Sequence, residues 1–135
     1  MCHGLWRTPA SQRLELRLKT IYEGVVGLVE EHAPDGLALE ESYVGADARI
    51  ALSVGQARGA VLVAGALAGV ECAEYAPARV KQAVCGYGRA DKGQVQRMVR
   101  MILGVEEQLS EHASDALAVA VCHALAPRLL KLEAR

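Results

Sequence analysis

Three side chains that can bind a metal ion lie in two distant parts of the sequence. Glu40 ends the short apolar run "LALE", and His112 and Asp115 stand three residues apart in "EHASDALAVAVCHALA", 111–126. Positions i and i+3 of a helix face the same way, and a carboxylate near a helix N-terminus stays ionised. Carboxylates suit magnesium, and histidine serves as a ligand or as a general acid or base. On its own, however, a His-x-x-Asp pair is more often a structural cap than a site.

A near-twin of this pair, "EHAPD", occupies residues 31–35. Pro34 disfavours helical backbone at Ala33, which places His32 in the last turn of the preceding helix. A cation there is favoured by the helix dipole, and Asp35 then belongs to a turn. We interpret this second copy as structural, and its likeness to the first as coincidence.

Length and composition predict one domain with one hydrophobic core. The chain has 135 residues, of which 52% are hydrophobic and 4% aromatic. Its longest uncharged stretches, 59–70 and 116–127, have 12 residues each, whereas a membrane-spanning helix needs about 20. The first residues show no hydrophobic signal region, so we expect a cytoplasmic protein without a membrane partner. The four cysteines form no C-x-x-C pair, which argues against a zinc site or a disulfide framework.

The charges are unevenly distributed although the net charge is only −1. Residues 79–100 contain one acidic residue, Asp91, and six basic ones: Arg79, Lys81, Arg89, Lys92, Arg97 and Arg100. Residues 105–115 contain four acidic residues and no lysine or arginine. A basic block beside an acidic one can hold a polyanion next to metal-binding carboxylates. The commoner explanation of such a pattern is a solvated face.

The hydrophobic periodicity predicts an α/β protein. It indicates helices over 11–32, 47–68, 77–84, 94–103 and 112–126, a buried strand at 37–40 and a second strand at 70–75. In open α/β sheets, sites lie beyond the carboxyl ends of the strands, which is where Glu40 falls. The last helix is rich in Ala and Val and can lie close to the sheet, with His112 and Asp115 directed at Glu40.

Four segments together resemble the RuvC family of bacterial Holliday-junction resolvases. They are "LALEESY", "GQARG", "EYAPARVKQAVCGYGRADKGQVQRMVRMILG" and "HASDALAVAVCHA", in that order along the chain. The likeness runs from about residue 4 to 126 and is most specific over 75–104, with 127–135 as a basic tail. It implies a single RuvC-like nuclease domain over 1–135, with the family's three-layer, ribonuclease-H-like α/β fold.

The resemblance also implies an activity and its residues. The family consists of crossover junction endodeoxyribonucleases, which resolve Holliday junctions in recombination and DNA repair by metal-dependent nicking of two strands. Its metal-binding and catalytic positions fall on Glu40, His112 and Asp115, with Mg²⁺, or Mn²⁺ in its place, at two ions per subunit. The implied DNA-binding residues are Lys81, Lys92, Tyr43, Arg89 and Arg49, with Tyr43 as the aromatic wedge at the junction point. The implied partners are a four-way DNA junction, a second copy packed through the helix at 47–68, and the RuvA–RuvB branch-migration complex.

The sequence departs from the family pattern at its start. The family begins with a strand carrying "D-x-G", whose aspartate is a metal ligand, and no aspartate precedes Asp35 here. "GLWRT", 4–8, resembles the end of the family's third strand, so we expect an N-terminally truncated sheet flanked by helices. Three interpretations follow: a truncated active resolvase, a degenerate protein that binds four-way junctions without cleaving them, or an unrelated small α/β metal protein. We expect the 135-residue chain to cut junctions poorly or not at all until a D-x-G hairpin is restored.

Overall fold

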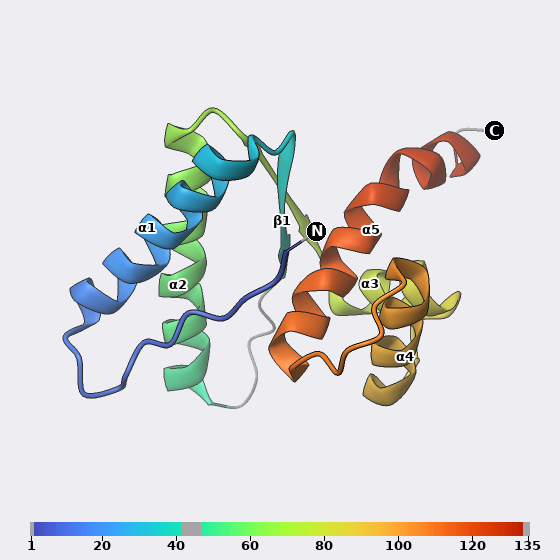
Figure 1. Ribbon diagram of the computed structural model, residues 1–135, viewed down its shortest axis with the longest axis horizontal. Helices are drawn as coiled ribbons and strands as arrows, with labels where there is room; N and C mark the ends of the chain where they lie inside the picture. The colour runs from blue at the N-terminus through green and yellow to red at the C-terminus, as the bar shows by residue number, and fades with distance from the viewer. Residues whose placement is uncertain (1, 42–46, 134–135) are drawn as a thin grey trace. The chain divides into compact units, whose positions relative to one another are not determined.

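A computed structural model of the chain describes residues 2–41 and 47–133, with side chains described as far as Ala126. The elements follow one another as α1 (Leu14–His32), β1 (Gly36–Glu40), α2 (Ala48–Leu67), β2 (Glu71–Tyr75), α3 (Pro77–Cys85), α4 (Lys92–Leu103) and α5 (Glu111–Glu133) (Figure 1). The helices and both strands predicted from the hydrophobic periodicity are present, which confirms the α/β class. The predicted wedge residue Tyr43 lies outside the described residues.

The chain divides into two compact units. The α1–α2 unit comprises Trp6–Leu37 and Ser42–Ala73, and the α3–α5 unit comprises Met1–Leu5, Ala38–Glu41 and Glu74–Arg135. Both strands begin in the first unit and end in the second. They form a two-stranded parallel sheet whose crossover connection contains α2. The backbone N–H of Glu41 donates to the carbonyl of Tyr75 at 2.9 Å, which ties together the carboxyl ends of the two strands.

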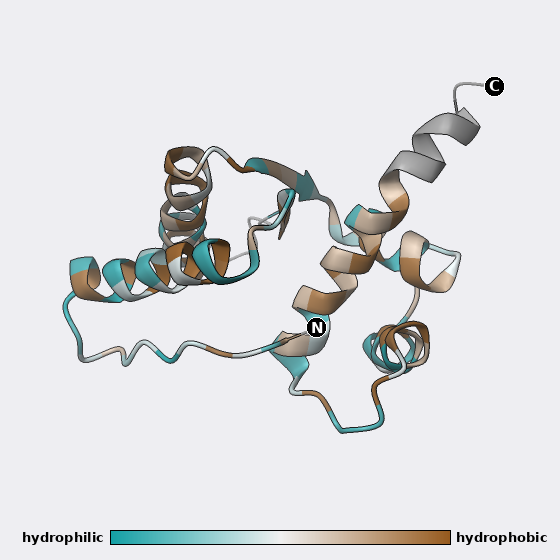
Figure 2. Ribbon diagram, turned by 45° about the horizontal axis from the view of Figure 1, so that its top comes forward, coloured by the Kyte–Doolittle hydropathy of each residue, from teal (hydrophilic) through white to brown (hydrophobic). Residues whose placement is uncertain are grey.

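Within the α1–α2 unit, two glycines allow close packing. A Cβ on Gly24 of α1 would lie 2.5 Å from the Trp6 indole, and one on Gly65 of α2 would lie 2.5 Å from the Cys72 sulfur. The hydropathy of α1 changes across the helix, as the teal and brown sides in Figure 2 show. By length and composition α2 could span a membrane, although core helices of soluble proteins pass the same test. The expectation of no membrane partner therefore stays a prediction.

The core of the α3–α5 unit consists of small aliphatic side chains from its three helices. It includes Val80, Val84, Val95, Val99, Leu117, Ala118, Val121 and Cys122. Pro77 occupies the first turn of α3, and Gly86 ends that helix with a φ of 86°. α4 begins at Lys92, two residues before the predicted start, because Asp91 and Gln94 form a capping box.

The structure corrects three expectations. β1 is half-buried and not buried, since the described sheet has two strands and each leaves one edge unpaired. Residues 4–8 form no strand, and the sheet within the described residues consists of β1 and β2. α5 continues through Pro127 to Glu133, where a basic tail was expected. A proline removes one hydrogen bond of the helix, and the sequence after it, "RLLKLE", consists of good helix formers.

The second copy of the motif, "EHAPD" at 31–35, lies at a helix end and in a turn, as predicted. α1 ends at His32, Ala33 follows in the left-handed conformation with a φ of 43°, and Asp35 lies in a bend before β1.

Candidate active site

Four of the charged side chains predicted to act at the site line one pocket in the α3–α5 unit. Its volume is about 320 Å³, and Glu40, Lys81, Lys92 and Asp115 line it. The apolar part of the lining consists of Pro77, Val80, Val95 and Ala118. One pocket thus holds two carboxylates and two ammonium groups over a floor that belongs to the hydrophobic core.

Each charged residue reaches the pocket from a different element. Glu40 is the last residue of β1, Lys81 lies on α3, Lys92 is the first residue of α4, and Asp115 lies one turn inside α5. Core valines lie beside the two lysines or one turn along the same helix. The packing of α3 and α4 therefore also fixes the backbone positions of those lysines. The arrangement agrees with the rule that sites form beyond the carboxyl ends of parallel strands.

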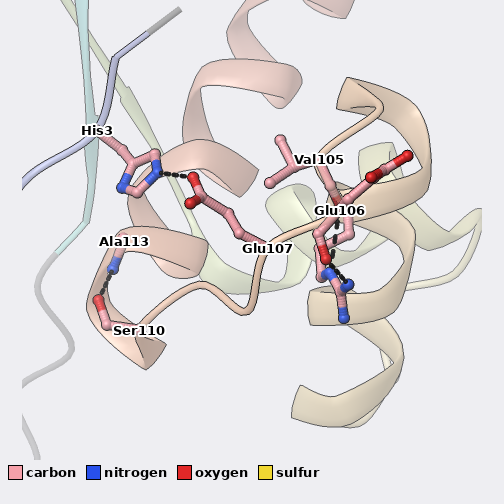
Figure 3. A network of polar contacts seen from close by, with 7 residues as sticks. His3, Val105, Glu106, Glu107, Ser110 and Ala113 are labelled. Atoms are coloured by element: carbon pink, nitrogen blue, oxygen red, sulfur yellow. Dashed lines mark hydrogen bonds and ion pairs between the residues drawn. The ribbon is translucent and has the colours of Figure 1, made fainter.

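The first turn of α5 is held by the loop that leads into it. The Arg100 guanidinium donates to the backbone carbonyls of Val105 at 3.4 Å and Glu106 at 2.6 Å (Figure 3). His3 contacts Glu107 at 2.9 Å, and the Ser110 hydroxyl accepts the Ala113 N–H at 3.3 Å. These contacts fix the approach of the chain to Glu111 and Asp115.

Lys92 is paired with two acidic residues of α5. Its ammonium group hydrogen-bonds to Glu111 and lies 3.4 Å from the Asp115 carboxylate. The hydrogen bond to Glu111 is the main reason that the pKa of Lys92 is raised, and the same bond lowers the pKa of Glu111. Glu111 did not emerge from the sequence as a site residue. Its only signal there is its place immediately before His112 at the start of the helix.

The pKa of Glu40 is changed by the groups around it. Its pKa is raised above the ordinary value of 4.5, chiefly by burial and then by repulsion from Asp115, while Lys92 and Lys81 act in the opposite direction. The repulsion shows that the two carboxylates share one electrostatic environment. A divalent cation beside them would relieve it, and carboxylate oxygens are the ligands that hard divalent cations prefer. The donor set therefore fits such an ion.

The other predicted residues are placed differently. His112 is exposed at the start of α5 and does not line the pocket, and no group of three or more His, Cys, Asp or Glu side chains in the described part of the chain is arranged to hold a metal. The role of His112 stays a prediction. Arg89 is exposed in the turn before α4, outside the pocket lining. Arg49 lies in the first turn of α2, in the other unit, where its backbone N–H donates to Asp47 at 2.9 Å.

Carboxylates beside lysines, at the end of a strand in an α/β fold, are typical of metal-dependent nucleases with a ribonuclease-H-like fold. The sequence profile of the family described as "Crossover junction endodeoxyribonuclease RuvC" matches residues 1–123. Proteins with that name are 49% identical over 122 residues in Geobacter sulfurreducens and 52% identical over 119 residues in Moorella thermoacetica. The matches cover 90% and 87% of this chain, and 74% and 71% of the relatives.

Solved structures agree with the sequence comparison. The structure of Thermus thermophilus RuvC superposes with a TM-score of 0.88 at 37% identity, covering 96% of this chain and 78% of that one. The same protein in complex with a Holliday junction substrate gives a TM-score of 0.87 at 39% identity, with 91% and 75% covered. The chain belongs to the RuvC family. Members of this family are metal-dependent endodeoxyribonucleases, and the resemblance drawn from the sequence is thereby confirmed.

Proposed function

We propose that this chain binds four-way DNA junctions and contributes the strand-cutting site of a Holliday-junction resolvase acting in recombination and repair. The observation that carries the proposal is the single pocket shared by Glu40, Asp115, Lys81 and Lys92. The related Thermus thermophilus RuvC has a solved structure in complex with a Holliday junction substrate, which supports the same substrate here. No observation favours the alternative of binding without cleavage.

The side chains divide the chemistry among them. Glu40 and Asp115 hold Mg²⁺, which Mn²⁺ can replace, and we propose two ions per subunit. When bound, such ions activate the attacking water and stabilise the leaving oxygen. Lys81 and Lys92 contact phosphate oxygens and align the backbone without reading the sequence. His112 contributes a further ligand or transfers a proton, since histidine side chains serve in both roles.

We also propose a homodimer formed through α2. A four-way junction has twofold symmetry and needs two paired nicks, which an isologous dimer supplies. Ile50, Leu52, Val63 and Leu67 of α2 are more than half exposed, at 64%, 63%, 53% and 73%. A Cβ at Gly55 or Gly59 would meet no atom within 4 Å, so a second helix can approach there. Sedimentation at tens of micromolar tests this, and a monomer alone would contradict it.

The remaining partners follow from family membership. Tyr43 is proposed to stack at the junction point, and Arg49 and Arg89 to contact the DNA backbone. The RuvA–RuvB complex is the proposed protein partner, and the cytoplasm is the proposed location.

Junction nicking tests the proposed activity. The assay compares the 135-residue chain with the same chain extended by a family-type D-x-G hairpin, in Mg²⁺ and in Mn²⁺. We expect the extended chain to make paired nicks, because accurate placement of the attacking water is worth about a hundredfold in rate. Glu40→Gln in the extended chain should bind junctions and not cut them. Cutting by that variant at the unsubstituted rate would show that the ligands are misassigned.

A further inference from the structure

A second, smaller pocket of the α3–α5 unit has no part in the proposed cleavage chemistry. Its volume is about 170 Å³. It is lined by Gly93, Gln96, Arg97 and Arg100 of α4, by Gln108 and Leu109 of the following loop, and by Ser114 of α5.

The two pockets lie on different faces of the same helices. The α4 residues of the second pocket stand at positions i, i+3, i+4 and i+7, which form one face of a helix. Lys92 and Val95 line the first pocket instead, and the two linings share no residue. On α5, the neighbours Ser114 and Asp115 likewise belong to different pockets.

Ser114 is the first indication that a polar ligand occupies the second pocket. Its side chain is 1% exposed, and among the described residues its hydroxyl has no hydrogen-bond partner. Buried hydroxyls in native proteins are nearly always hydrogen-bonded, so an unpaired one indicates a water or a ligand. The Ser114 hydroxyl is buried against a pocket that is large enough for either.

The charge of the lining selects an anion. Arg97 and Arg100 contribute two positive charges, and none of the lining residues is acidic. Arg100 is fixed by its bonds to the carbonyls of Val105 and Glu106, and Figure 3 shows the Glu106 carboxylate directed away from that carbonyl. The Arg97 Nη1 lies 3.5 Å from where a Gly93 Cβ would be, so its guanidinium lies over the first turn of α4.

The start of α4 adds to this preference. Its first N–H groups point out of the helix and favour negative charge. Asp91, the N-cap of this helix, accepts the Gln94 N–H at 2.9 Å. Arg97 forms no ion pair within the part of the chain that the structure describes.

We propose that this pocket binds a phosphate group of the DNA backbone and anchors the junction at a second point, away from the cleavage pocket. Arg97 and Ser114 donate to the phosphate oxygens, and Arg100 supplies charge from a fixed position. The proposal rests on the proposed function, since it assigns the phosphate to the junction.

The salt dependence of junction binding tests the assignment in the 135-residue chain. Each lost phosphate contact reduces the slope of log affinity against log salt by about one, and weakens binding roughly fivefold to tenfold at 0.1 M salt. We expect this of Arg97→Gln. Ser114→Ala should weaken binding about twofold to threefold without lowering the melting temperature, because it removes an unpaired hydroxyl. Lys81→Gln is the positive control, and Lys19→Gln on α1 is the matched loss of an exposed charge.

The outcomes separate this proposal from the proposed function. If Arg97→Gln binds like Lys19→Gln while Lys81→Gln loses slope, the second anchor is wrong and junction binding stands. If the unsubstituted chain binds no junction, the proposed function fails and the assignment to DNA fails with it. Titration with inorganic phosphate, followed through the amide signals of Gly93 and Ser114, then decides whether the pocket binds phosphate at all. Saturable shifts of these amide signals that Arg97→Gln abolishes would show that the pocket binds phosphate. Unchanged signals would show that it does not.

Discussion

Lys92 is a cation paired with Asp115 in the pocket that we propose for cleavage. Its ammonium group lies 3.4 Å from Asp115 and hydrogen-bonds to Glu111. It therefore offsets part of the negative charge that would attract a divalent ion. Lys92→Met removes the charge and keeps most of the side-chain length. We therefore expect this substitution to strengthen Mn²⁺ binding to the DNA-free chain and to weaken junction binding.

The exposure of the pair limits the size of the effect. The side chains of Lys92 and Asp115 are 52% and 39% exposed, so water and salt screen most of their attraction. Measured effects of such pairs are small, which corresponds to a gain of about twofold to fivefold in Mn²⁺ affinity. The gain should shrink further at high salt, because screening also weakens the competition that Lys92 exerts.

Titration of Mn²⁺, followed by the electron paramagnetic resonance signal of the free ion, measures this gain. Lys81→Met is the matched control, since Lys81 lines the same pocket and the described residues include no carboxylate ion-paired with it. Both variants should lose junction affinity, and Lys92→Met should show the larger gain in metal affinity. Weaker Mn²⁺ binding by Lys92→Met would refute the idea that lysine and metal compete for Asp115.

Three further outcomes are expected. Glu40→Gln should raise the melting temperature at pH 7 and leave it nearly unchanged at pH 4. Because the pKa of Glu40 is raised in the folded chain, that chain binds more protons than the unfolded chain above pH 4.5. Ionised Glu40 therefore lowers stability as pH rises through that range. A lower melting temperature at pH 7 would contradict this. Asp115→Asn in the D-x-G-extended chain should stop junction nicking while gel-shift affinity persists, and retained nicking would remove Asp115 from the ligands. Val99→Ala should lower the free energy of unfolding by about 2 kcal/mol in urea titrations, since Val99 is 0% exposed, whereas Val63→Ala on the exposed face of α2 should change it far less.

The elements could be predicted because their signals are local. Pro34 marks the end of α1 and Pro77 marks the start of α3, and each acts through its own backbone. The start of α4 was also readable, since "DKGQ" is a capping-box pattern, but Gly93 makes the first turn a poor helix former on propensity alone. The burial of β1 was not predictable in this way, because it depends on how many strands pair beside it.

Part of the site could likewise be predicted from the sequence, and part depends on contacts between residues far apart in the chain. Family resemblance and the strand-end rule brought Glu40, Asp115 and the two lysines to one pocket, as the structure has them. The contact between Lys92 and Glu111 joins the first residues of two helices, 19 positions apart, and no spacing rule within one helix contains it. The position of the buried Ser114 hydroxyl beside a second pocket likewise appears only when α4 and α5 pack.

These observations explain why a chain with such a small core can hold a charged pocket. The lysines and Asp115 share their helices with the valines and alanines of one core, so packing positions all three charges together. Glu40 comes from the strand end, and burial beside Asp115 opposes its ionised form. Lys92 and Lys81 act in the opposite direction and favour the ionised form of Glu40. In the structure Lys92 pairs with Asp115, and a divalent ion held by Glu40 and Asp115 would compete with that pair.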